Sequence, residues 1–272
     1  MRLLLLALAL VAAGCTGSRP LADGPPWPAE IPDADLQTAI DALARGFGGR
    51  VGVYARHLPT GRTVALAADS LFPTASIIKV PILVATMDAV DRGDLSLDQG
   101  IVFRDSLRYD DYGLFGLLRD SARVELHRAI ETMLSASDNN SSLWLQALSG
   151  GGEQINAFFS ARGYEGTRMN SRTDGRRADW QAYGWGQTTP REMARLFREI
   201  VETDVDVVSP EADEEMHRML TRTFWDDEAI AVLPPSVQVA SKQGAVSDSR
   251  SEALYVHAPS GPYLLTVFTD GQ

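Results

Sequence analysis

The stretch PTASIIKVPIL, residues 73–83, places Lys79 one helical turn after Ser76, in the middle of an apolar run. Residues three apart lie on the same face of a helix, so the two side chains are predicted to be neighbours. The apolar setting disfavours the ammonium form of the lysine, and a neutral amine can take the proton of a serine hydroxyl. Pro81 lacks an N–H and is tolerated near a helix start, where the helix dipole favours developing negative charge on Ser76. The stretch therefore predicts a serine nucleophile that is activated by lysine.

Lysine is almost absent from this chain. Of its 25 basic residues only Lys79 and Lys242 are lysines, and all the others are arginine. Arginine serves wherever only positive charge is needed, but a guanidinium does not lose its proton in a protein, whereas burial can lower the pKa of an amine. The two lysines are therefore interpreted as functional residues. The alternative is that they remained by drift and extend to the surface.

The bulk composition is that of an ordinary globular protein with one large domain. The chain has 272 residues, 44% of them hydrophobic, and a net charge of −11, which argues against a nucleic-acid partner because phosphate binding needs a basic surface. Its four histidines are scattered without metal-ligand spacing, and it has no Gly-x-Ser-x-Gly sequence. We therefore expect no metal or cofactor and no Ser-His-Asp triad. The protein is also expected to be a monomer.

The N-terminus has the pattern of an export signal. Leu3–Ala13 is an apolar segment, too short to span a bilayer as a mature helix, and small residues follow it before Cys15, the single cysteine. This resembles a bacterial lipoprotein signal, which predicts a signal peptide over residues 1–14 and a periplasmic protein held to the membrane by a lipid on Cys15. An ordinary secretory signal and a mistaken start codon are the alternatives. Residues 15–32, rich in proline and glycine, are expected to tether the domain 33–272.

Segments with strand character lie at both ends of the domain, and helical segments lie between them. Alternating apolar residues predict strands at 51–57, 62–68, 236–246, 251–258 and 262–270. Helical spacing predicts one helix near residues 33–47 and a long helical insert from about residue 72 to 220. The economical arrangement is an α+β fold, in which a five-stranded antiparallel sheet flanked by helices packs beside an all-helical subdomain.

The predicted boundaries place a sheet subdomain at 33–70 and 212–272, and a helical subdomain at 71–211. A cleft between two such parts is the usual place for a small-molecule site. Within the insert, Thr189-Pro190-Arg191-Glu192 is a capping box that predicts a helix start. The sequence ends at Gln272, directly after the last predicted strand. Either the sequence is truncated, or the first helix alone covers one face of the sheet.

Two further motifs follow the Ser76-x-x-Lys79 pair. Ser137-Asp138-Asn139 begins 61 residues after the serine, and Lys242-Gln243-Gly244 begins 166 residues after it. Each motif alone has an ordinary interpretation, the first as a helix-capping turn and the second as a charged edge strand. Together, and in this order, they resemble the serine penicillin-recognising enzymes, specifically the class A β-lactamases and their relatives. The resemblance covers nearly all of residues 33–272.

The resemblance implies a role for each residue on the nucleophile side of the site. Ser76 would be the acylated nucleophile, and Lys79 its base or a proton relay to one. Ser137 would pass the proton to the leaving nitrogen. Asn139 would orient Lys79 and hydrogen-bond the amide of the substrate. Acyl transfer needs such a set of nucleophile, base and acid.

The resemblance also implies how the substrate is bound. Lys242, in the motif that contains Gly244, would bind the substrate carboxylate and help to lower the pKa of the first lysine. The backbone N–H groups of Ser76 and Ala245 would form the oxyanion hole. Arg250, on the next strand, is a weaker match for a second contact to the carboxylate. The implied partner is a β-lactam or a cell-wall peptide.

The loop before the Thr-Thr-Pro helix departs from the family pattern. Class A β-lactamases carry a glutamate there that activates the water for deacylation, but residues 166–190 contain none, and their only carboxylates are Asp174 and Asp179. An aspartate is one methylene shorter, and small misplacements of a catalytic group are costly. Gln243 replaces the usual Thr or Ser of the third motif, which removes a hydroxyl contact to the substrate carboxylate. Good acylation with poor hydrolysis is therefore expected.

Three functional hypotheses remain open at this point. The first is a class A-type β-lactamase that deacylates through Asp174, Asp179 or Lys79. The second is a related serine hydrolase or D,D-peptidase that acts on a peptide or ester, such as a D-alanyl peptide of the cell wall. The third is a penicillin-binding or sensor protein that stays acylated.

Overall fold

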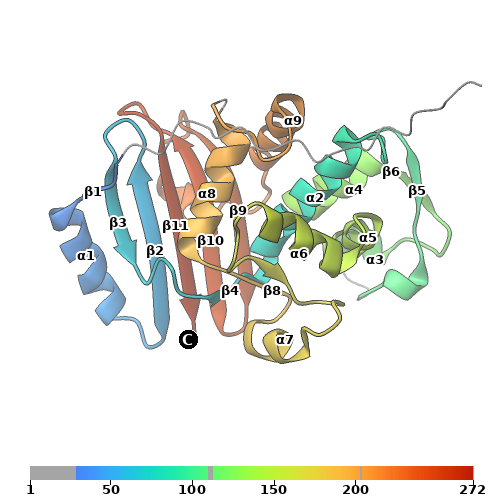
Figure 1. The fold of residues 1–272 in the computed structure, drawn as a ribbon, viewed down its shortest axis with the longest axis horizontal. Helices are drawn as coiled ribbons and strands as arrows, with labels where there is room; N and C mark the ends of the chain where they lie inside the picture. Colours follow the sequence, from blue (N-terminus) through green and yellow to red (C-terminus); the bar gives the residue numbers. More distant parts are fainter. Residues whose placement is uncertain (1–28, 110–112, 203, 272) are drawn as a thin grey trace, which may run out of the picture.

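The computed structural model describes residues 29–109, 113–202 and 204–271. The predicted signal peptide, Cys15 and the tether up to residue 28 lie outside these residues. Figure 1 shows one large sheet, with helix α8 lying across it and most of the other helices gathered beside its β9 edge. In the described part of the chain, no helix is long and apolar enough to cross a membrane.

Strands from both ends of the chain form one sheet. In spatial order they are β1 (Ile31–Pro32), β3 (Arg62–Leu66), β2 (Arg50–His57), β11 (Tyr263–Asp270), β10 (Ser249–His257) and β9 (Gln238–Val246). The five long strands run antiparallel to their neighbours, which confirms the predicted α+β fold and its five-stranded antiparallel sheet. β1 adds a short parallel strand beside β3. The sequence did not reveal it, because two residues are too few for alternation to be visible.

The helices fill the chain between the two groups of strands. In chain order they are α1 (Ala34–Arg45), α2 (Lys79–Asp91), α3 (Gly113–Gly116), α4 (Leu126–Ser135), α5 (Asn139–Leu148), α6 (Gly151–Ala161), α7 (Arg177–Tyr183), α8 (Pro190–Val201) and α9 (Pro210–Leu220). The 3-10 turns are η1 (Ala75–Ile78), η2 (Asp105–Leu107) and η3 (Ile230–Val232). Two small ladders complete the structure, one of β4 (Phe72–Pro73), β8 (Gly186–Thr188) and β7 (Arg168–Met169), the other of β5 (Gly100–Val102) and β6 (Arg123–Glu125).

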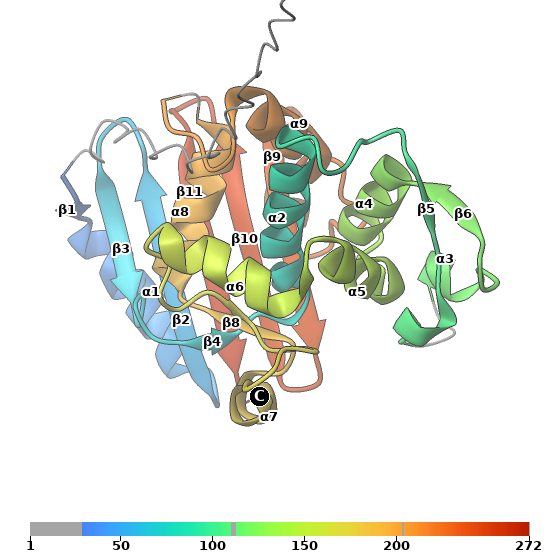
Figure 2. The ribbon, with the colours of Figure 1, turned by 45° about the vertical axis from the view of Figure 1, so that its right-hand side comes forward.

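α2 is the central helix of the structure. Figure 2 shows it between the sheet and the pair α4 and α5, and it also contacts α6 and α9. Residues 79–87 are buried on every side, as expected for a helix that other elements surround. α8, whose residues fall in the range assigned to the helical subdomain, packs instead on β2, β10 and β11. The sheet and the helices therefore share one continuous core.

The sheet face away from α8 is covered by more than one element. Tyr255 reaches the end of α8, so its neighbours Leu254 and Val256 point to the opposite face, where each is only 1% exposed. α1 packs against β3 at one side of the sheet. The N–H of Ala229, just before η3, donates to Glu252 on β10 at 2.8 Å. The segment before β9 therefore shares the covering of this face with the first helix.

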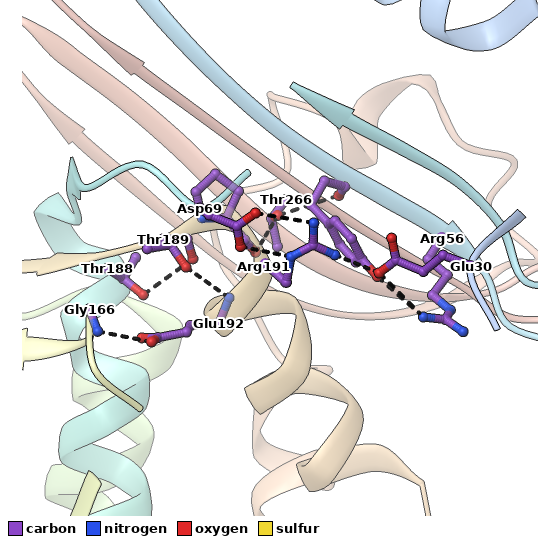
Figure 3. Close-up of polar contacts among 11 residues, drawn as sticks. Glu30, Arg56, Asp69, Gly166, Thr188, Thr189, Arg191, Glu192 and Thr266 are labelled. Carbon is purple, nitrogen blue, oxygen red and sulfur yellow. Dashed lines mark hydrogen bonds and ion pairs between the residues drawn. The ribbon is translucent and has the colours of Figure 1, made fainter. Parts of the chain in front are cut away.

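The start of α8 holds the loop that precedes it (Figure 3). Thr189 accepts the N–H of Glu192 at 3.1 Å, and Pro190 occupies the first turn, as the capping box predicted. The carboxylate of Glu192 does not complete the box. It accepts three consecutive backbone N–H groups of residues 165–167 at 2.7 to 2.9 Å. Because these hydrogen bonds are charge-assisted, they fix one end of the loop 166–190 to α8.

The same helix turn also holds the residues just before α1. The guanidinium of Arg191 pairs with Asp69 at 2.8 Å and with Glu30 at 2.5 Å, and Glu30 also lies 3.7 Å from Arg56. Residues 29–32, which the sequence assigned to the tether, therefore lie against the domain. Local sequence patterns could not predict these contacts, because the partners of Glu30 come from strands and helices distant along the chain.

The variant Glu192→Gln tests the anchor between α8 and the loop. A neutral amide loses the charge-assisted hydrogen bonds and turns an NH2 group towards backbone N–H donors. We expect the free energy of unfolding to fall by about 1–3 kcal/mol, and the amides of residues 165–167 to exchange faster with solvent. Chemical denaturation and hydrogen exchange measure these effects. The control Glu214→Gln removes an exposed carboxylate of α9 and should change stability by less than about 0.5 kcal/mol. Equal losses in the two variants would contradict the anchor.

Candidate active site

Ser76 lies in the η1 turn that leads directly into α2. The preceding Ala75 has a backbone φ of 44°, in the left-handed region, so a sharp turn delivers the serine to the helix start. α2 begins at Lys79, whose Nζ lies 3.0 Å from Ser76 Oγ. Lys79 is completely buried, with 0% of its surface exposed. The structure thus brings the serine and the lysine into direct contact in a dry environment.

Lys79 also contacts the second motif. Its Nζ lies 2.5 Å from the carbonyl oxygen of Ser137, 3.1 Å from Ser137 Oγ and 2.9 Å from Asn139 Oδ1. Ser137 has a φ of 59°, again in the left-handed region, and this conformation lets both its carbonyl and its hydroxyl face the same amine. Strained backbone of this kind persists only where its surroundings hold it in place. The amine of Lys79 therefore lies within hydrogen-bond distance of oxygen atoms from Ser76, Ser137 and Asn139.

The capping interpretation of the second motif also holds in the structure. Asp138 is the N-cap of α5 and accepts the N–H of Ser141 at 2.8 Å. It also accepts the N–H of Phe115 at 3.1 Å. The helix cap therefore fixes Asp138, and its two neighbours Ser137 and Asn139 are presented to Lys79 as a consequence.

Lys242, on β9 of the sheet, also contacts Ser137. Its Nζ lies 3.1 Å from Ser137 Oγ and 2.7 Å from the carbonyl oxygen of Gln243, and the residue is only 1% exposed. Although β9 is an edge strand, the interpretation of Lys242 as a solvated edge charge is wrong, because the side chain is buried. Burial lowers the pKa of Lys242 to about 7, and the negative charge of Glu252 opposes part of this shift.

A cleft of about 320 Å³ opens above these groups. Ser76 and Asn139 line it from the helical side, and Ala245 lines it from β9. Ala245 is exposed, whereas the two lysines lie buried next to the cleft. A molecule in the cleft therefore meets the serine hydroxyl and the backbone of β9, while the two amines lie buried behind the cleft wall.

Three aromatic residues also line this cleft. Tyr109 comes from the segment after η2, Tyr183 is the last residue of α7, and Trp185 comes from the loop that follows α7. Tyr183 and Trp185 flank Gly184, whose φ of 68° allows the chain to turn between them. In the sequence, the two aromatic residues on either side of Gly184 were the signal that could have predicted this contribution to the cleft. The loop therefore contributes aromatic side chains to the cleft wall.

Gly244 permits the close approach of β9 to the start of α2. A Cβ atom at this position would lie 2.6 Å from the carbonyl oxygen of Thr74 and 2.8 Å from the backbone nitrogen of Ser76. Both atoms are backbone and cannot move aside as a side chain would. Only glycine therefore lets the strand lie close enough for Ala245 and Ser76 to line one cleft.

Three other predicted residues lie elsewhere, and none is among the described residues that line this cleft. Asp174 is exposed and lines a neighbouring cavity. Asp179 pairs with Arg176 at 3.3 Å on α7. Arg250 is exposed, and its guanidinium donates to backbone carbonyls of the β9–β10 turn. The structure therefore does not bring either aspartate, or the guanidinium, to the serine.

The described residues offer no arrangement of three His, Cys, Asp or Glu side chains that could hold a metal ion. The rings of His217 and His257 stack, with 5.5 Å between their centroids, at the contact of α9 with the end of β10. Burial, assisted by the neighbouring His257, lowers the pKa of His217. This pair lies apart from the residues that line the cleft.

The variant Gly244→Ala tests the contact between β9 and the helix start. The added methyl group should push the strand away, lower stability by about 1–3 kcal/mol and slow the labelling of Ser76 by a fluorescent penicillin by about a hundredfold. Gly48→Ala is the matched control, because nothing lies within 4 Å of a Cβ atom there. Labelling at the normal rate in Gly244→Ala would show that the close approach is not required.

Comparisons with known proteins agree with this geometry. The sequence profile of the β-lactamase enzyme family matches residues 35–272. A β-lactamase of Streptomyces albus G is 30% identical over 252 residues, which cover 87% of this chain and 77% of that protein.

The fold of this chain is also similar to those of solved structures. PBP-A has a TM-score of 0.82 at 27% identity over 90% of both chains, and a PBP-A mutant with the same scores was solved as an acyl-enzyme complex with penicillin G. An ancestral class A β-lactamase has a TM-score of 0.75 over 87% of this chain and 92% of that chain, and at 24% identity it supports the fold alone. Because the family profile matches almost the whole described chain, this protein belongs to the β-lactamase enzyme family, whose members include hydrolases that act on β-lactams.

Proposed function

We propose that this protein opens β-lactam rings through a covalent acyl-enzyme formed on Ser76. Family membership supports a hydrolase that acts on β-lactams. The serine mechanism rests on one observation, the set of oxygen atoms around the buried Lys79. Its Nζ lies 3.0 Å from Ser76 Oγ, and two other partners, the Ser137 carbonyl and Asn139 Oδ1, can only accept hydrogen bonds.

A neutral amine fits these partners. It has two N–H groups, which the Ser137 carbonyl and Asn139 Oδ1 can accept, and one lone pair, which can accept the hydroxyl proton of Ser76 or of Ser137. The serine O–H then donates to Lys79 Nζ, the arrangement that proton removal requires. An ammonium at Lys79 would instead donate its third proton to Ser76 Oγ and would have no lone pair to accept the hydroxyl proton of the serine. Desolvation of Lys79 works in the same sense, because burial disfavours the charged form.

The acylation step follows from these contacts. Ser76 Oγ attacks the carbonyl carbon of the β-lactam while Lys79 takes its proton, and the carbonyl oxygen becomes an anion. The backbone N–H groups of Ser76 and Ala245 would stabilise that anion. When it collapses, the ring C–N bond breaks and the nitrogen takes a proton from Ser137, which Lys79 replaces. Ser137 Oγ lies 3.1 Å from both Lys79 Nζ and Lys242 Nζ, which suits this relay.

Deacylation is the step for which the cleft is least equipped. Of the three groups that the sequence offered, Asp174 and Asp179 lie away from the residues around Ser76, and Lys79 alone touches the serine. The loop 166–190 contains no glutamate and gives the cleft wall Tyr183 and Trp185. This observation favours a second candidate function, a penicillin-binding protein that deacylates slowly.

We also propose that the protein is exported and carries a lipid on Cys15. The support is the sequence of residues 1–15 alone. The tether would leave the domain next to Glu30, which pairs with Arg191 at the start of α8. A membrane location would place the cleft where β-lactams and cell-wall peptides are encountered.

The variants Ser76→Ala and Lys79→Arg test the mechanism. Turnover of nitrocefin should be lost in Ser76→Ala, and intact-mass spectrometry should find no penicilloyl adduct. Lys79→Arg should be as inactive as Lys79→Ala, since a guanidinium keeps the charge but cannot act as a base. Each loss should exceed about a hundredfold, the scale of general-base catalysis. Normal acylation of the arginine variant would refute the role of Lys79.

The same measurements on the unaltered protein separate the candidate functions. Rapid nitrocefin turnover supports the β-lactamase. A persistent adduct on Ser76 with little turnover supports the slowly deacylating protein. If neither signal appears, the alternative of a peptide or ester hydrolase gains support, and D-alanyl peptides become the substrates to examine.

The pKa of Lys242 predicts a pH dependence. Its side chain is charged below about pH 7 and neutral above it, so binding of a substrate carboxylate should weaken as the pH rises through that value. We expect kcat/KM for benzylpenicillin to fall by up to about tenfold per pH unit beyond it. In Lys242→Arg the guanidinium stays charged, so this decline should disappear from the profile. A decline that persists unchanged in the arginine variant would assign it to another group.

A further inference from the structure

A second cavity lies directly beside the cleft that holds Ser76. Its volume is about 580 Å³, and Tyr109 and Trp185 line both cavities. The rings of Tyr109 and Trp185 meet edge to face, with 4.8 Å between their centroids. The two cavities are therefore neighbouring compartments that share one aromatic wall.

Arginine dominates the charge of the second cavity. Arg172 and Arg177 line it and are exposed, and Asp174 is the one carboxylate among its described lining residues. Within the described chain, the guanidinium of Arg172 has no hydrogen bond or ion pair. The loop from residue 168 to 179 carries four arginines and two aspartates, in a chain with a net charge of −11. The described residues that line this cavity carry two positive charges and one negative charge, which favours an anion there.

The cavity also offers aromatic surface. Trp180 lines it with 39% of its surface exposed, and the guanidinium of Arg177 lies over the indole ring, 4.7 Å from its centroid. Trp185 lines it from the shared wall. An apolar or aromatic group can pack on these rings while a carboxylate on the same group reaches the arginines. The cavity thus combines the two features that recognise an aryl group that carries a negative charge.

The two cavities meet at a wall that a substrate side chain can reach. Ser76 lines the first cleft together with Tyr109 and Trp185, and these two aromatic residues also line the second cavity. A group that extends from a substrate at Ser76 past Tyr109 and Trp185 therefore enters the second cavity. The ring carboxylate is assigned to Lys242, so the acyl side chain is the part of the substrate that remains to extend in this direction.

We propose that the second cavity is a subsite for an anionic acyl side chain of the β-lactam, with Arg172 and Arg177 as the groups that bind its carboxylate. The subsite rests on the proposed function, because it requires acylation at Ser76. It gives this protein a preference for β-lactams whose side chain carries a second negative charge.

Two penicillins that differ by one carboxylate provide the test. Carbenicillin is benzylpenicillin with an added carboxylate on the acyl side chain. The constant kcat/KM contains only the steps up to acylation, so the ratio of its values for the two compounds reports the contact without interference from deacylation. Arg172→Gln and Arg177→Gln should each lower the ratio of carbenicillin to benzylpenicillin by about two- to fivefold. Asp174→Asn should raise it.

The control variant is Arg45→Gln. It makes the same change in net charge at an exposed position of α1 and should leave the ratio unaltered. Added salt should lower the ratio in the unaltered protein, because exposed charges are screened. An unchanged ratio in the double arginine variant, or an equal change in Arg45→Gln, would overturn the subsite while leaving acylation at Ser76 intact. If the unaltered protein neither hydrolyses benzylpenicillin nor forms an adduct with it, the proposed function fails and the subsite falls with it.

Discussion

The burial of one amine is the constraint on which the rest of this structure depends. Lys79 is completely enclosed, and its partners come from η1 and from the start of α5. A charged group is costly in such a place, and a polar group is stable there only when its hydrogen bonds are satisfied. The positive φ of Ala75 and Ser137 directs their segments towards the amine. The strained backbone at Ala75 and Ser137 is therefore part of what satisfies the hydrogen bonds of the buried lysine.

The sheet adds the second amine and the wall of the cleft. Lys242 and Lys79 share the hydroxyl of Ser137, so the protonation of one amine influences what the other can donate. A pKa of about 7 for Lys242 leaves this network close to a change of charge under physiological conditions. α8 supports the opposite wall, because Glu192 fixes the beginning of the loop that carries Tyr183 and Trp185. Elements far apart in the sequence therefore converge on one small volume.

Much of this could be predicted from the sequence. Alternation identified the five long strands, and the spacing of Ser76 and Lys79 predicted their contact. The order of the motifs identified the family that the profile later matched. The sequence could not place Asp174, because a loop has no periodicity from which to infer direction, or Asp179, because α7 is too short for its period to be recognised. The contacts of Glu30 and the aromatic wall were also missed, since both depend on long-range packing that local patterns do not encode.

Gly244 also limits how this protein can diverge. A methyl group there would meet backbone atoms of Thr74 and Ser76, so the position is closed to almost any replacement that keeps the site intact. Exposed neighbours on the cleft wall, Ala245 and Val246, face no such obstacle. Substitutions that reshape the cleft without disturbing its backbone are therefore expected at these two positions and in the facing loop, whereas Gly244 has to stay glycine.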